Sequence, residues 1–137
     1  GSMEFGCAVA GAKLAVVMGH TKCGAVTAAV KFSDSQQTVE QATGCQHLPA
    51  VIDEIRKAID PQDFKKQKQR SENQKAEYVD EVARNNVLKT IQRILQESRI
   101  IRQLVEEGKV GLVGAMYDVV TGNIEFFSGE TGPLIDE

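Results

Sequence analysis

Several features that mark large classes of proteins are missing from this 137-residue chain. No apolar run approaches the roughly 20 residues of a membrane span, and no charged, apolar and small-residue series opens the chain like a secretory signal. The net charge of -3 argues against DNA or RNA as the main partner, because binding either requires a basic face. The sequence also has no Ser-His-Asp order, no glycine-rich phosphate loop and no paired catalytic carboxylates. We therefore expect no membrane span in this chain and no nucleic-acid partner.

Cysteine is scarce as well, with 3 residues in the whole chain. A small, odd number of cysteines does not build a disulfide framework, so a reducing, cytoplasmic location is expected. The composition, 42% hydrophobic and 26% charged, is typical of a globular protein with one core. We therefore predict a single domain over residues 1–137, in which residues 128–137 form a frayed polar tail.

The spacing of the apolar residues predicts an α/β fold, with a partly parallel sheet and flanking helices. The mainly apolar run at residues 13–18 shows no alternation, which predicts a strand covered on both faces. A second apolar strand is predicted at residues 110–119. The helical segments between them predict a right-handed parallel crossover. The turn signal at residues 121–123 leads into a third predicted strand at residues 124–127, which pairs back on the second.

Helices are predicted from apolar spacing, small residues and cap signals at residues 3–10, 23–30, 48–59, 79–95 and 98–107. In the first of these, Ser2 is the expected N-cap, and Phe5, Val9 and Cys7 are expected to face the core. The segment 32–44 is expected to be polar and irregular. The segment 65–75 has no apolar period, and it is expected to be an exposed loop or the start of a helix. The scattered acids Asp34, Asp53 and Asp80 are expected to be solvated.

The stretch from Gly19 to Gly24 places a histidine and a cysteine three positions apart, directly after the first predicted strand. Open α/β sheets bind their ligands at the carboxyl ends of strands. Imidazole and thiolate are both good zinc donors, so His20 and Cys23 are candidate ligands of Zn²⁺. Zinc takes three or four protein ligands, however, so the pair is also compatible with a histidine bonded to backbone and a structural cysteine.

Further donors are available by residue type. Cys7, Cys45 and His47 are candidates, although a core cysteine, a loop cysteine and a helix-entrance histidine are the plainer interpretations. A second copy of the chain offers another solution. His20 and Cys23 from each of two chains would form a closed, tetrahedral and structural Cys₂His₂ site.

Several separated motifs closely resemble the β-class carbonic anhydrases, in the order that this family shows. They are Ser2-Met3-Glu4-Phe5, the strand with Gly-His-Thr-x-Cys-Gly-Ala-Val ending at Val26, Asn85-Asn86-Val87, and Gly114-Ala115-Met116-Tyr117-Asp118 followed by Thr121-Gly122. The resemblance implies a zinc lyase that interconverts carbon dioxide and bicarbonate, in which the metal lowers the pKa of a bound water. It also implies that His20 and Cys23 are the second and third protein ligands of the zinc.

One motif of that family, Cys-x-Asp-x-Arg, occurs nowhere in the sequence. It supplies the first zinc ligand and an aspartate–arginine dyad, from a strand beside the one at residues 13–18. The resemblance therefore implies an N-terminally truncated domain that lacks the first two family strands, with weak zinc binding and weak or absent hydratase activity. The apolar strand left at an edge predicts a homo-oligomer.

Two alternatives remain open. The chain is also compatible with a non-catalytic, oligomerising or metal-binding module, as part of a larger protein such as an anion transporter. A thiol-redox protein that uses Cys23 is a further alternative, which would require a depressed thiol pKa.

Overall fold

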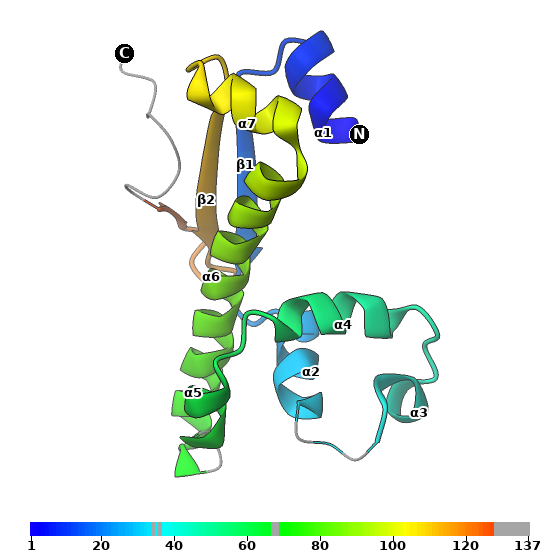
Figure 1. Cartoon of the computed structure of the whole chain (residues 1–137). Coiled ribbons are helices and arrows are strands. Elements are labelled where there is room, and N and C mark those ends of the chain that lie inside the picture. Colours follow the sequence, from blue (N-terminus) through cyan, green and yellow to red (C-terminus); the bar gives the residue numbers. More distant parts are fainter. Residues whose placement is uncertain (34, 36, 67–68, 128–137) are drawn as a thin grey trace. The chain divides into compact units, whose positions relative to one another are not determined.

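The computed structural model describes residues 1–33, 35, 37–66 and 69–127 (Figure 1). Contacts divide the chain into two units, one formed by residues 1–19 with 87–137 and the other by residues 20–86. Each unit is described by itself below. The single domain predicted over residues 1–137 stays a prediction, and the tail predicted to fray at 128–137 lies outside the described residues.

The first unit is built on a three-stranded sheet in the order β1-β2-β3, formed by β1 (Leu14–His20), β2 (Gly111–Tyr117) and β3 (Ile124–Phe126). Strands β1 and β2 run in the same direction (Figure 1). Strand β3 is antiparallel to β2, with Ala115 opposite Phe126. The turn between them includes Gly122, whose φ of 79° lies in the left-handed region that favours glycine. The predicted α/β fold with a partly parallel sheet is confirmed.

The two parallel strands differ in burial. Strand β2 is buried from Leu112 to Met116, as its apolar run predicts. Strand β1 alternates instead, and Leu14, Val16 and Met18 are 53%, 41% and 47% exposed. The prediction that β1 is covered on both faces is therefore wrong for the described residues. The alternation shows that the described elements cover one face of β1 and leave the other exposed. Strand β1 also lies at an edge of the described sheet.

The N-terminal helix consists of a short turn, α1 (Ser2–Glu4), that continues into the π-helix η1 (Phe5–Val9). Both pack against α7 (Arg99–Glu106). Ser98 caps α7 as predicted, because its Oγ accepts the amide N–H of Ile101 at 3.2 Å, and the same hydroxyl donates to the Glu4 carboxylate. This contact turns the Glu4 side of the helix toward α7.

Two expectations for this helix are therefore wrong. Phe5 and Val9 are 63% and 70% exposed, and only Cys7 is half-buried, because the face toward α7 is the one that carries Glu4. The predicted N-cap is also displaced, since Gly1 occupies that position and Ser2 is already helical.

The second unit contains α2 (Gly24–Phe32), α3 (Val39–Thr43), α4 (Leu48–Arg56), α5 (Pro61–Lys66) and the first part of α6 (Glu72–Glu97). Helices α2 and α3 pack against α4, whose Ile52 and Ile55 are buried. Arg56 closes the end of α2, since its Nη2 donates to the Phe32 carbonyl at 2.8 Å. Helix α3 lies within the segment expected to be irregular, so that expectation is wrong for residues 39–43.

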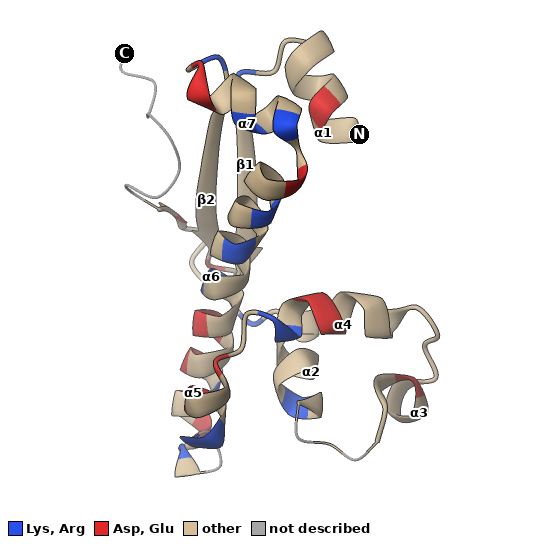
Figure 2. Ribbon diagram, in the orientation of Figure 1, with Lys and Arg blue, Asp and Glu red and all other residues tan. Residues whose placement is uncertain are grey.

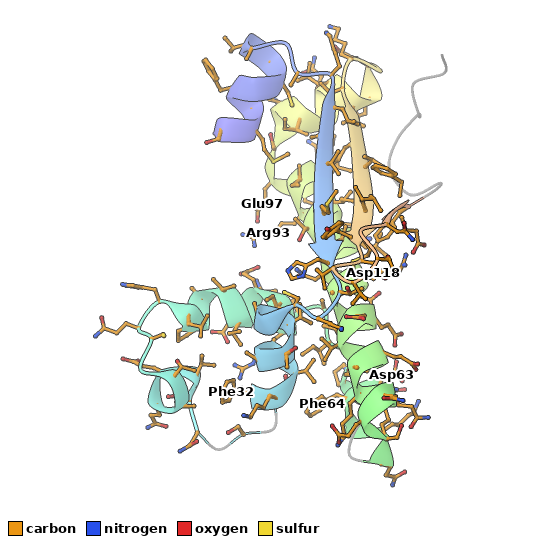
Figure 3. The ribbon with its side chains drawn as sticks, turned by 180° about the vertical axis from the view of Figure 1, so that it is seen from behind. Phe32, Asp63, Phe64, Arg93, Glu97 and Asp118 are labelled. Carbon is orange, nitrogen blue, oxygen red and sulfur yellow. The ribbon has the colours of Figure 1, made fainter. Side chains whose placement is uncertain are left out.

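Helix α6 continues from one unit into the other and carries mixed charge along its length (Figure 2). Ion pairs lie on its surface, for example between Arg93 Nε and Glu97 Oε1 at 2.7 Å, both labelled in Figure 3. Such exposed pairs contribute little to stability. Among the described residues, no helix is both long and apolar enough to cross a membrane.

Candidate metal centre

The two predicted zinc donors lie at the two ends of one tight connection. His20 is the last residue of β1, and Cys23 is the N-cap of α2. Only Thr21 and Lys22 separate them, and we call residues 20–23 the donor turn. The strand–turn–helix context predicted from the sequence is therefore present, although this placement by itself does not test metal binding.

Lys22 gives the donor turn its shape. Its φ of 56° is the only positive value at a non-glycine residue among the described residues. A side chain in this left-handed region crowds the following carbonyl, which costs about 1 kcal/mol for an ordinary residue. The conformation therefore needs support from the surrounding structure.

That support comes from Asp80 on α6. The backbone N–H of Lys22 donates to Asp80 Oδ1 at 2.8 Å, across 58 positions of sequence. Asp80 is half-buried, so the expectation of a solvated acid is wrong for this residue. Nothing in the local sequence identifies this residue, since Asp80 belongs to no motif and lies far from Lys22 along the chain.

The imidazole of His20 is oriented by its own neighbour. His20 Nδ1 lies 2.9 Å from the carbonyl oxygen of Thr21. A carbonyl only accepts, so Nδ1 carries the proton in this contact. The lone pair of the neutral ring is then on Nε2, and His20 is exposed. This is the tautomer in which Nε2 binds a metal ion.

The thiol of Cys23 also remains available. Cys23 is a free, half-buried cysteine, and its side chain does not cap α2. Its backbone carbonyl accepts instead, from Thr27 N at 2.9 Å and from Thr27 Oγ1 at 2.8 Å. These bonds fix the start of α2 without using the sulfur atom.

Donor type and donor number give different answers for zinc. A neutral imidazole and a cysteine thiolate are donor types that zinc prefers. Within the described part of the chain, however, no three His, Cys, Asp or Glu side chains gather as a metal site. Cys45 and His47 therefore do not complete one, and Cys45 is exposed. Cys7 lies half-buried on η1 of the first unit. The residues fit two positions of a zinc centre and not a whole centre.

The turn that follows β2 is shaped by hydrogen bonds of Asp118. Asp118, labelled in Figure 3, shapes the turn before β3, since its Oδ1 accepts the amide N–H groups of Val120 at 2.8 Å and Thr121 at 3.3 Å. Gly122 N also donates to the Asp118 carbonyl. These bonds account for the aspartate and glycine of that motif by turn formation.

Comparison with known proteins decides the family. The sequence profile described as carbonic anhydrase matches residues 1–124. The chain belongs to the carbonic anhydrase family. Carbonic anhydrase 1 from Escherichia coli O157:H7 is 28% identical to it over 134 residues, which are 98% of this chain.

Solved structures show the β-class fold. A tetrameric beta-carbonic anhydrase from Sordaria macrospora matches 93% of the chain with a TM-score of 0.70 and 19% identity. The β-carbonic anhydrase CafA of Aspergillus fumigatus matches 92% with a TM-score of 0.70 and 23% identity. The chain covers 55% of the E. coli protein, 58% of the first structure and 53% of the second, so it spans about half the length of its relatives. The resemblance to β-class carbonic anhydrases is confirmed.

Proposed function

We propose that this carbonic anhydrase chain supplies His20 and Cys23 as two ligands of a zinc centre that serves the reversible hydration of carbon dioxide to bicarbonate. We further propose that the 137 residues alone bind zinc weakly and hydrate carbon dioxide slowly or not at all. Family membership supports the activity. The low activity rests on one observation, the donor turn with two zinc donors and no third one among the described residues.

The test is the zinc content of the chain, measured by elemental analysis on protein equilibrated with the same added zinc concentration in every variant. His20→Ala and Cys23→Ser should each lower the zinc content. Cys45→Ser is the matched control, because it removes an exposed thiol outside the donor turn and should change nothing. Zinc retained in both donor-turn variants would overturn the proposed ligands.

The hydration rate, followed with a pH indicator after rapid mixing, tests the second half of the proposal. The zinc-loaded chain should show little or no hydration above the uncatalysed rate. A rate in the usual range of enzymes, with kcat above roughly 1 s⁻¹ and lost in His20→Ala, would show that the described donors suffice.

A second function is favoured by a different observation. The exposed apolar face of β1 supports a non-catalytic, oligomerising module, in which zinc is shared between two chains or is absent. About half a zinc per chain in a dimer would support a shared site with four ligands. A cytoplasmic location is proposed as well, since all three cysteines are free.

A further inference from the structure

The donor turn is stabilised by a residue that lies far from it in the sequence. Its central residue, Lys22, has a left-handed backbone that lysine rarely adopts. Its amide N–H reaches the carboxylate of Asp80, 2.8 Å away on α6. A hydrogen bond to an ionised acceptor is stronger than one between neutral groups. Asp80 therefore opposes the tendency of Lys22 to return to an ordinary backbone conformation.

The conformation of Lys22 affects the relative positions of His20 and Cys23. His20 and Cys23 are joined only by Thr21 and Lys22, so a change in φ at Lys22 redirects the chain between the two donors. Metal ligands need their positions fixed by surrounding contacts, and loss of such a contact costs affinity even though the ligands remain.

We propose that Asp80 is a positioning residue of the donor turn: its carboxylate holds Lys22 in the left-handed conformation and so fixes the spacing of His20 and Cys23. The proposal deepens the proposed function and rests on it for the identity of the metal ligands. Asp80 has this role without being a metal ligand itself.

Asp80 lies beside a cavity and near a lysine that pairs with another carboxylate. A cavity of about 850 Å³ borders it, lined also by Lys22, Glu72 and Lys75. Lys75 is the lysine nearest along α6, and its Nζ pairs with Glu72 at 2.7 Å. The Oδ1 atom of Asp80 accepts the backbone N–H of Lys22 in the donor turn.

The metal experiment is a titration of the chain with Co²⁺, a spectroscopic substitute for zinc, followed by visible absorption. Asp80→Ala should weaken Co²⁺ binding at least about tenfold. Asp80→Asn keeps an Oδ1 acceptor and should stay within about threefold of the unchanged protein, as expected for a neutral hydrogen bond that replaces a charged one. Glu81→Ala is the control, because it removes the neighbouring, exposed carboxylate and should leave affinity unchanged.

A double-mutant cycle separates positioning from general damage. Glycine adopts the left-handed region without strain, so Lys22→Gly removes the need for support. In the Lys22→Gly background, Asp80→Ala should then weaken Co²⁺ binding by less than about threefold, because the two changes act through one contact. An equal loss in both backgrounds, or an equal loss in Glu81→Ala, would overturn the proposal.

Amide hydrogen exchange of the metal-free protein keeps this proposal distinct from the proposed function. Asp80→Ala should speed exchange of the Lys22 amide by about tenfold or more, as expected when a local hydrogen bond opens. If exchange changes but Co²⁺ does not bind, the proposed metal function fails while the structural contact holds. If exchange at Lys22 is unchanged, the positioning role itself is refuted.

Discussion

Replacing Gly114 by alanine is expected to destabilise the first unit, because β2 has no room for a side chain at this position. A Cβ atom there would lie 2.7 Å from Phe127 Cδ2 and 3.1 Å from both Ile91 Cδ1 and Val87 Cγ1. Non-bonded carbons prefer about 3.5–4.0 Å, so all three contacts are too short. The shortest one is also the hardest to relieve. The Phe127 backbone is tied to Gly114, since Phe127 N donates to the Gly114 carbonyl at 2.9 Å.

The expected loss in the free energy of unfolding follows from two opposing effects. Overpacking by a methyl group in a close-packed core costs about 1–3 kcal/mol. The lower entropy of the unfolded alanine chain offsets about 0.5–1 kcal/mol of this. We therefore expect a net loss of about 1–2 kcal/mol, which corresponds to a fall in melting temperature of roughly 2–8 °C for a chain of this length.

Urea unfolding followed by circular dichroism measures this loss. Gly6→Ala is the matched control, because a Cβ at Gly6 would meet nothing within 4 Å and its backbone is helical. That variant should be unchanged or slightly more stable. A Gly114→Ala protein as stable as the control would mean that α6 does not pack on β2 this closely. A coupling of about 0.5 kcal/mol or more with Phe127→Ala would locate the strain in the shortest contact.

Three further outcomes are expected. Tyr78→Phe should leave the free energy of unfolding unchanged or raise it by up to about 1 kcal/mol, because the buried hydroxyl has no partner among the described residues; a clear loss in urea unfolding would contradict this. Burial raises the pKa of Tyr78 above 10.0, so the stability that this group contributes is complete below pH 10.0 and is lost as pH rises through the raised pKa. Ultraviolet titration of a Tyr117→Phe protein reports Tyr78 alone, and a midpoint at or below 10.0 would be evidence against that shift. Changing Leu14, Val16 and Met18 together to threonine should reduce self-association in sedimentation with little loss of stability, since these side chains are 41–53% exposed; an unchanged mass would exclude this face from self-association.

Sequence reasoning succeeded where the signal was local. The apolar run of β2, the serine cap of α7 and the hairpin turn at Gly122 each depend on residues within a few positions of one another. The position of His20 and Cys23 at the end of a strand is of the same kind. A capping box was missed in the polar segment, although it is also local: Thr38 and Gln41 bond reciprocally at the start of α3. Both residues are polar, so apolar periodicity gives no sign of this cap.

The rest could not be predicted, because it depends on which distant residues meet. Asp80 lies 58 positions from Lys22, and a lone aspartate on a helix carries no mark of its partner. The orientation of the N-terminal helix depends in the same way on the contact of Glu4 with Ser98. An apolar run likewise indicates only that a strand is suited to a position where both of its faces are buried. It does not indicate whether helices of the same chain pack on those faces.

The two incomplete features of this chain meet at one strand. Among the described strands, β1 has a neighbour in β2 on one side only, and its C-terminal residue, His20, is a proposed zinc ligand without a complete donor set among the described residues. A strand added in parallel at the free edge of β1 would bring its own carboxyl end to the same edge as His20, because parallel strands present their carboxyl ends together. A donor on such a strand could reach the zinc, and the strand would also satisfy the unpaired edge of β1. Pairing at the edge of β1 and zinc binding should therefore increase together. A partner segment that restores zinc affinity should also protect the backbone amides of β1 from hydrogen exchange. A segment that restores zinc affinity without this protection would show that edge pairing and metal binding are independent.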